Sequence, residues 1–208
     1  MDLSSLISDM KVVTVSGAQK GVGKTALAEF LLQNLSGFAA IKITMTDLYT
    51  SVLEDDEEIM VPETDTFRMS RSGAKKVIWV RATEKLLLDA MEQALEKIDN
   101  YKGVLIEGNS ILEYINPSLA FFVVNSTIEH MKPSRISSLK KADICVINQK
   151  NGCTVSDETI DEIKSINPEI EFFNFDFSSD ISKESEEANN LKIYLKNKIK
   201  YQSDTGVL

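Results

Sequence analysis

The sequence predicts an α/β fold, in which helices cover both faces of a doubly wound, mostly parallel sheet of about seven strands. Short apolar runs alternate with amphipathic helical stretches along almost the whole chain of 208 residues. Several runs are apolar at nearly every position, which is typical of parallel strands with both faces buried. A hydrophobic content of 43% is sufficient for a complete core. We therefore expect residues 1–208 to form a single domain of the Rossmann-like, three-layer type.

A glycine-rich segment separates the first expected strand, at 11–16, from the first expected helix, at 24–35. The helix places four apolar residues on one face: Leu27, Phe30, Leu31 and Leu35. The segment between them has the pattern of a phosphate-binding loop, with alanine at the position where the first glycine usually stands. Its expected nucleotide-binding residues are Ala18, Gln19, Lys20, Gly21, Val22, Gly23, Lys24, Thr25 and Ala26.

Each residue type in this loop has a physical reason to be there. Gly21 and Gly23 let the backbone turn so that its amides face a phosphate at a helix N-terminus. Lys24 is expected to reach the β- and γ-phosphates, and the Thr25 hydroxyl is expected to bind Mg²⁺. The segment therefore predicts a domain that binds a nucleotide together with Mg²⁺.

The remaining elements follow in alternation. Further strands are expected at 38–44, 76–81, 103–108, 119–125, 142–148 and 169–175, and further helices at 83–99, 134–141, 155–165 and about 185–200. The last helix carries an apolar stripe for docking on the body of the domain: Leu191, Tyr194, Leu195 and Ile199. Residues 45–64 interrupt the alternation and predict a long acidic loop.

Two further segments carry charged residues that are candidates for the site. Glu107 ends the 103–108 strand and is expected to hold Mg²⁺ together with Thr25, so Lys24, Thr25 and Glu107 are the candidate catalytic residues. Asp65 and Arg68 stand three residues apart after the acidic loop. Two interpretations of this pair remain open: an ion pair on a helix surface, or a contact of Arg68 with phosphate or a second substrate.

The order of four segments, SGAQKGVGKT, IKIT, DTFRMSRSGA and VLIEG, resembles the molybdopterin-guanine dinucleotide biosynthesis adaptor (MobB-type) family over about residues 10–150. That family belongs to the P-loop class that also contains dethiobiotin synthetase and metal-insertion GTPases. The resemblance implies GTP binding, a partner enzyme of cofactor biosynthesis, and a homodimer. It makes Lys42, Asp65 and Arg68 substrate-binding candidates.

The chain also departs from that family. The family has a His-rich stretch after the second-strand lysine, which is Lys42 here, and this chain lacks that stretch. Asp47 is then the nearest candidate metal ligand. Gln19 stands where the partner-activated ATPases of this fold have a signature lysine, which disfavours that subclass.

The nucleotide base is left open between guanine and adenine. Asn148 matches the asparagine of the guanine-specific Asn-Lys-x-Asp pattern, but Gln149 replaces its lysine and Asn151 its aspartate. An uncharged amide at position 151 weakens guanine preference. GTP and ATP are therefore both candidate ligands.

The resulting hypothesis is Mg²⁺-dependent binding and slow hydrolysis of GTP or ATP in an accessory role for cofactor biosynthesis, related to the molybdenum cofactor (molybdopterin-guanine dinucleotide). One alternative is an ATP-dependent small-molecule ligase or kinase resembling dethiobiotin synthetase. Another is a nucleotide switch that acts through a protein partner.

Composition excludes other functions. A net charge of −9 disfavours nucleic acid or an anionic membrane as the partner. Two cysteines, Cys145 and Cys153, are too few for a disulfide framework or a zinc site, and Cys145 is expected in a buried strand. The chain shows neither a signal-peptide pattern nor an apolar run long enough to span a membrane, so we expect a cytoplasmic protein.

Overall fold

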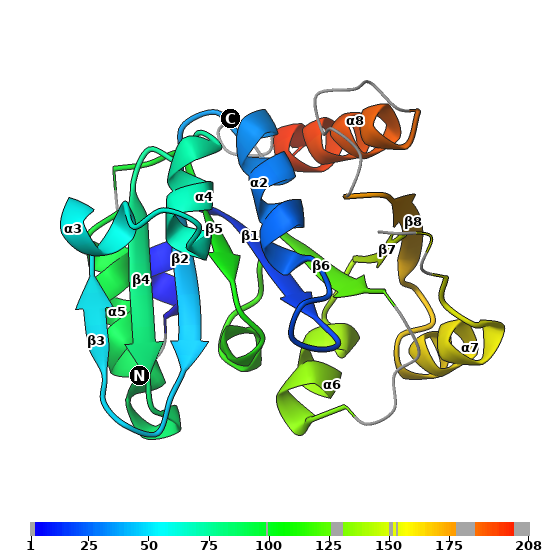
Figure 1. Cartoon of the computed structure of the whole chain (residues 1–208), viewed down its shortest axis with the longest axis horizontal. Helices are drawn as coiled ribbons and strands as arrows, with labels where there is room; N and C mark the ends of the chain where they lie inside the picture. Colours follow the sequence, from blue (N-terminus) through cyan, green and yellow to red (C-terminus); the bar gives the residue numbers. More distant parts are fainter. Residues whose placement is uncertain are drawn as a thin grey trace.

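The computed structural model describes residues 3–98, 100–125, 131–149, 152, 154–177 and 186–201, and its central feature is one eight-stranded sheet (Figure 1). The strands lie in the order β3-β4-β2-β5-β1-β6-β7-β8. Seven are parallel, and β3 runs antiparallel to β4. The strand bounds are β1 Lys11–Gly17, β2 Phe38–Met45, β3 Ser51–Leu53, β4 Val77–Ala82, β5 Gly103–Glu107, β6 Leu119–Val124, β7 Ile144–Asn148 and β8 Glu171–Phe175.

Helices cover both faces of the sheet, as the sequence predicts. On one face lie α2 (Lys24–Asn34), α4 (Asp65–Arg71) and α8 (Glu186–Tyr201), which share one apolar cluster. On the other lie α1 (Ser4–Ile7) and α5 (Leu87–Glu96), and beside them α6 (Pro133–Lys140) and α7 (Asp157–Ile166). Neighbouring residues of a strand supply opposite faces: Phe121 belongs to the first cluster and Phe122 to the layer under α6 and α7.

The predicted helix faces are confirmed. All four apolar residues predicted on the face of α2 are buried. On α8, Leu191 and Leu195 are buried, and Tyr194 and Ile199 pack against the same cluster as half-buried side chains. Cys145 is fully buried in β7, as expected. The fold class predicted from the alternation of elements is therefore the one observed.

The acidic segment is the main correction. Residues 45–64 were expected to be a loop, but they contain strand β3 and the short helix α3 (Asp56–Ile59), so the sheet has eight strands rather than about seven. A three-residue strand next to a run of acids is too short to show an alternation of apolar and polar residues. The acids themselves are partly paired: Glu54 contacts the ammonium groups of Lys76 and Lys97.

The strand order brings functional strand ends together. β1 lies between β5 and β6, and the chain crosses to one side of β1 for β2 and to the other for β6. In such sheets ligands bind outside the carboxyl ends of the strands at this reversal. The two short 3₁₀ helices, Glu84–Leu86 and Ser110–Glu113, lie after β4 and β5 at the same end. Within the described ranges, every helix is too short or too polar to span a bilayer.

Candidate functional site

The glycine-rich loop begins at a tightly held strand end. The Asn109 side chain accepts from the Gly17 amide at 2.9 Å and donates to the Gly17 carbonyl at 3.1 Å, which ties the end of β1 to the segment after β5. Gly21 and Gly23 have φ of 81° and 107°, in the left-handed region that favours glycine. The loop then leads directly into α2, which begins at Lys24.

Asn148 supports this loop from the end of β7. Its side-chain amide donates to the Val22 carbonyl at 2.8 Å. A Cβ on Gly23 would lie 2.5 Å from the same amide nitrogen, so Asn148 can take this position only if residue 23 is a glycine. The sequence predicts that Asn148 contacts the base, and the structure adds a role in holding the loop. Asn151, where the guanine-specific pattern has its aspartate, lies outside the described residues, as does Cys153.

Lys24 folds back over its own loop. Its ammonium group donates to the Gln19 carbonyl at 3.0 Å. Burial lowers the pKa of Lys24 below its ordinary value of 10.5, and the nearby cations Lys42 and Arg135 act in the same direction, against Glu107 and Asp65. Burial is therefore the main reason why the charge of Lys24 is disfavoured, and an anion bound beside the ammonium group would stabilise that charge.

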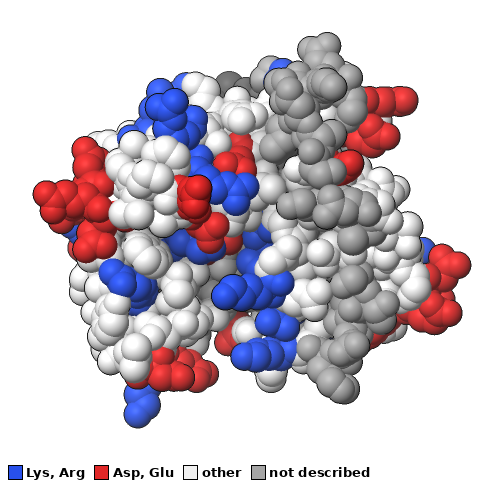
Figure 2. Space-filling view, in the orientation of Figure 1, with Lys and Arg blue, Asp and Glu red and all other residues white. Residues whose placement is uncertain are grey.

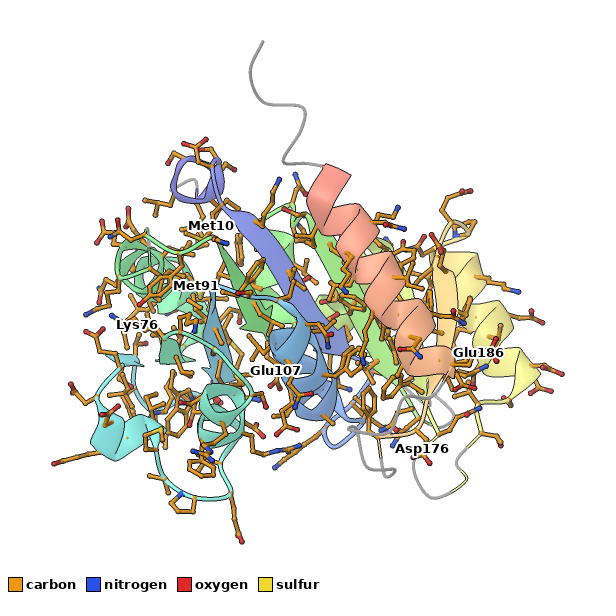
Figure 3. All side chains as sticks on the ribbon, turned by 90° about the horizontal axis from the view of Figure 1, so that it is seen from above. Met10, Lys76, Met91, Glu107, Asp176 and Glu186 are labelled. Carbon is orange, nitrogen blue, oxygen red and sulfur yellow. The ribbon has the colours of Figure 1, made fainter. Side chains whose placement is uncertain are left out.

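A charged network lies beside Lys24 and follows from strand register. Lys42 on β2 and Glu107 on β5 are partners in the parallel ladder, so their side chains emerge side by side. The Lys42 ammonium lies 2.5 Å from Glu107 Oε1 and 2.6 Å from the Asp65 carboxylate. The Thr25 hydroxyl donates to the other Glu107 oxygen at 3.0 Å. Glu107 is 1% exposed, and Figure 3 shows it next to α2.

The local structure of α4 holds Asp65 in this network. Thr64 caps the helix, its hydroxyl accepting from the Phe67 amide, and Asp65 takes the first helical position, where a negative charge is favourable. Burial alone would raise the pKa of Asp65, but the hydrogen bond and charge of Lys42 bring it below the ordinary 3.8. Burial likewise opposes the Lys42 charge, yet Glu107 and Asp65 raise the Lys42 pKa above 10.5.

A pH dependence follows from the lowered Asp65 pKa. Because this carboxyl titrates lower in the folded state, its stabilisation is present above about pH 4 and is lost as the pH falls through the folded pKa. Asp65→Asn is expected to lower the free energy of unfolding at pH 7 by less than about 1 kcal/mol, since Asp65 is partly exposed. The difference from wild type should shrink below about pH 4 in urea titrations.

Asp161→Asn, at an exposed position on α7, is the matched control for this prediction and should show no such loss at pH 7. A difference between Asp65→Asn and wild type that stays constant from pH 7 to pH 3 would contradict the role given to the Asp65 charge.

The donor set at this point fits Mg²⁺. The Thr25 hydroxyl and the Glu107 carboxylate lie within hydrogen-bond distance of each other, and the Asp65 carboxylate also interacts with the Thr25 side chain. Hydroxyl and carboxylate oxygens are the ligands that Mg²⁺ prefers. Asp47, the other predicted ligand, follows the end of β2 with an exposed side chain and lines a neighbouring cavity instead.

Arg68 does not pair with Asp65. Its guanidinium forms a bidentate pair with Glu29 on α2, at 2.9 and 2.5 Å, while Asp65 pairs with Lys42. The ion pair between Asp65 and Arg68 on the helix surface, one of the two interpretations of the sequence, is therefore not formed. Instead, two ion pairs join α4 to α2 and β2, and Arg68 still borders the cavity.

An open cavity of about 570 Å³ contains most of these groups. Figure 2 shows Lys and Arg side chains gathered with acidic ones around a hollow near the centre of this face. Phe177, just after β8, borders the cavity next to Asn148 and stacks on Phe175 with ring centroids 4.5 Å apart. No motif in the sequence pointed to Phe177. The lining residues are Lys20, Gly21, Gly23, Lys24, Thr25, Ala26, Lys42, Ile43, Thr44, Asp65, Arg68, Glu107, Asn148 and Phe177. Of the other predicted loop residues, Ala18 and Val22 are buried beneath the loop.

A second cavity of about 670 Å³ shares a wall with the first. Lys24, Lys42, Ile43 and Glu107 line both. The second extends toward the N-terminus of α6 and the 3₁₀ helices after β4 and β5, and it includes Asp47. No sequence pattern predicts this cavity, because its wall comes from five separate segments of the chain.

Comparison with known proteins identifies the fold. No protein-family model and no curated protein matches the chain. Among solved structures, HypB from Helicobacter pylori in complex with nickel aligns over 98% of this chain and 93% of its own, with 13% identity and a TM-score of 0.58. The hydrogenase maturation factor HypB from Archaeoglobus fulgidus aligns over 94% of both chains, with 16% identity and a TM-score of 0.58. At these identities the likeness establishes a shared α/β fold and does not by itself assign a function.

Proposed function

We propose that this chain binds a nucleoside triphosphate with Mg²⁺ at the glycine-rich loop and hydrolyses it slowly. The observation that carries this proposal is the convergence of Lys24, Thr25 and Glu107 on one cavity at the carboxyl ends of β1 and β5. A loop with two left-handed glycines that leads into a helix N-terminus suits a phosphate chain. The shared fold with HypB is consistent with this function.

The chemistry would rest on position and charge. Lys24 can exchange its bond to the Gln19 carbonyl for a phosphate oxygen, and the loop amides would hold the β-phosphate. Thr25 and Glu107, with Asp65 beside them, would hold Mg²⁺, which supplies charge neutralisation at the phosphates. Among the described residues that line the first cavity there is no glutamine, and no sequence motif marks one of them as the residue that orients the attacking water. We therefore expect slow turnover by the isolated protein.

For the biological role, we propose an accessory protein of cofactor or metal-centre assembly, with Mg²⁺–nucleotide occupancy controlling delivery. The sequence resemblance to the MobB-type adaptors and the structural likeness to HypB, one solved with nickel and one described as a hydrogenase maturation factor, both support such a role. A molybdenum-cofactor substrate, a partner enzyme, a homodimer and a single-domain organisation remain parts of this proposal.

A second candidate is phosphoryl transfer or ligation to a small molecule. The second cavity favours it, because a space of about 670 Å³ meets the first at Lys24, Lys42 and Glu107, beside the expected γ-phosphate position. The size lies within the range of small-molecule sites.

Calorimetric titration with GTP and with ATP, each with Mg²⁺ and with excess EDTA, tests the proposed function. We expect saturable binding of at least one nucleotide that weakens markedly without Mg²⁺, because Thr25 and Glu107 contribute through the metal. Preference for GTP supports the adaptor role, and preference for ATP supports transfer to a small molecule. The absence of binding of both nucleotides at millimolar concentration would refute the proposal.

A further inference from the structure

The second cavity contains charged side chains that nucleotide binding does not use. Lys132, at the N-cap of α6, and Arg135, in its first turn, line the cavity, and Arg135 is half-buried. Neither side chain forms an ion pair with any residue in the described part of the chain. A partly buried guanidinium is normally paired, because burial of an unpaired charge is unfavourable.

The helix itself adds to this positive region. The first turn of α6 contains no acidic residue, and no side chain caps its N-terminus. Pro133 occupies the first turn, and Ser134 also lines the cavity. The exposed N-terminal dipole therefore adds to the two cationic side chains at this wall. The C-terminal half of α6 is anchored to the segment after β5, since the Ser138 hydroxyl donates to the Asn109 carbonyl at 2.9 Å.

The anchoring places α6 in a fixed relation to the phosphate loop. Asn109 also clamps Gly17 at the start of that loop, so α6 and the loop are connected through one residue. Arg135 is close enough to Lys24 for its charge to act on the Lys24 ammonium. Arg135 thus lies near the wall that the two cavities share, and Lys132 lines the second cavity with it.

From this arrangement we propose that the second cavity binds the oxyanion group, a carboxylate or phosphate, of a small second substrate, held by Arg135 and Lys132. This inference rests on the proposed function, which places the γ-phosphate of the nucleotide at the shared wall. Arg135 suits such a group, because a guanidinium binds carboxylate and phosphate oxygens in a bidentate manner.

The acidic residues of the cavity narrow the class of substrate. Asp47, Glu84 and Glu113 line the same space. Their carboxylates would repel a polyanion such as a nucleic acid backbone, and they accept hydrogen bonds from amino or hydroxyl groups. The structure therefore favours a compact molecule with one anionic end and hydrogen-bond donors elsewhere.

The test is an NMR titration of the full chain with inorganic phosphate and, separately, with malonate. The amides of Ser134 to Ile136 report on the second cavity, and those of Gly21 and Gly23 report on the phosphate loop. We expect at least one of the two anions to shift the α6 amides, both in the free protein and after a β,γ-imido nucleotide fills the loop. Arg135→Gln should weaken this response by about tenfold or more.

Lys140→Gln, at the exposed far end of the same helix, is the matched control and should titrate as wild type. If Arg135→Gln does not fold, Arg135→Lys should retain a weakened response, because it keeps the charge and loses the bidentate geometry. Unmoved α6 amides, or a wild-type response of the Arg135 variant, would overturn the inference. Failure of nucleotide binding is separate, because the α6 response is measured in nucleotide-free protein as well.

Discussion

Replacement of Lys24 by alanine is expected to weaken Mg²⁺–nucleotide binding by about 10- to 150-fold. The change removes an ammonium group that lines the cavity and donates to the Gln19 carbonyl of the loop. A hydrogen bond to a charged group contributes about 1.5–3 kcal/mol, which corresponds to that range of affinity. Calorimetry with the preferred nucleotide measures the loss directly.

The fold should survive the Lys24 change, because burial already opposes the charge of this residue. Lys140→Ala removes a lysine from an exposed helix end and serves as the control, with unchanged affinity. Equal affinity of Lys24→Ala and wild type would mean that the nucleotide binds elsewhere.

Gly23→Ala is expected to reduce the free energy of unfolding by about 2–5 kcal/mol. One part is the left-handed backbone at φ 107°, which costs an alanine about 1–2 kcal/mol. The other part is steric, because the new Cβ would lie 2.5 Å from the Asn148 amide nitrogen, and overpacking costs about 1–3 kcal/mol. Urea denaturation of the variant and of wild type gives the difference.

Gly21→Ala separates the two parts of this effect. Gly21 also has a positive φ, 81°, but a Cβ there would meet no atom within 4 Å. We expect about 1–2 kcal/mol for Gly21→Ala, from the backbone alone. Similar losses in both variants would show that the contact between Gly23 and Asn148 is relaxed at little cost.

The parts of the structure that the sequence predicted well depend on residues close together in the chain. The phosphate-loop pattern is local, because the same few residues supply the turn, the amides and the start of α2. The apolar faces of α2 and α8 are equally local, since a helix repeats every 3.6 residues. These features need no knowledge of strand order.

The pairings across the site could not be predicted, because they depend on which strands and helices become neighbours. Lys42 meets Glu107 only because β2 lies next to β5 in this register. Arg68 has an acidic residue three positions away in sequence, yet it pairs with Glu29, 39 residues distant. Phe177 and Arg135 stand in no motif, and only the assembled cavities reveal them.

The Lys42 bridge has a consequence for the order in which ligands enter. Both Glu107 oxygens are engaged, one by Thr25 and one by Lys42, and Lys42 also holds Asp65. A free divalent cation would have to compete with an ammonium group already seated between these carboxylates. A metal that arrives on a phosphate chain brings negative charge that can attract Lys42 away. For the proposed function, this implies that metal and nucleotide enter together, because Lys42 offsets part of the negative charge of the two carboxylates until a phosphate attracts it.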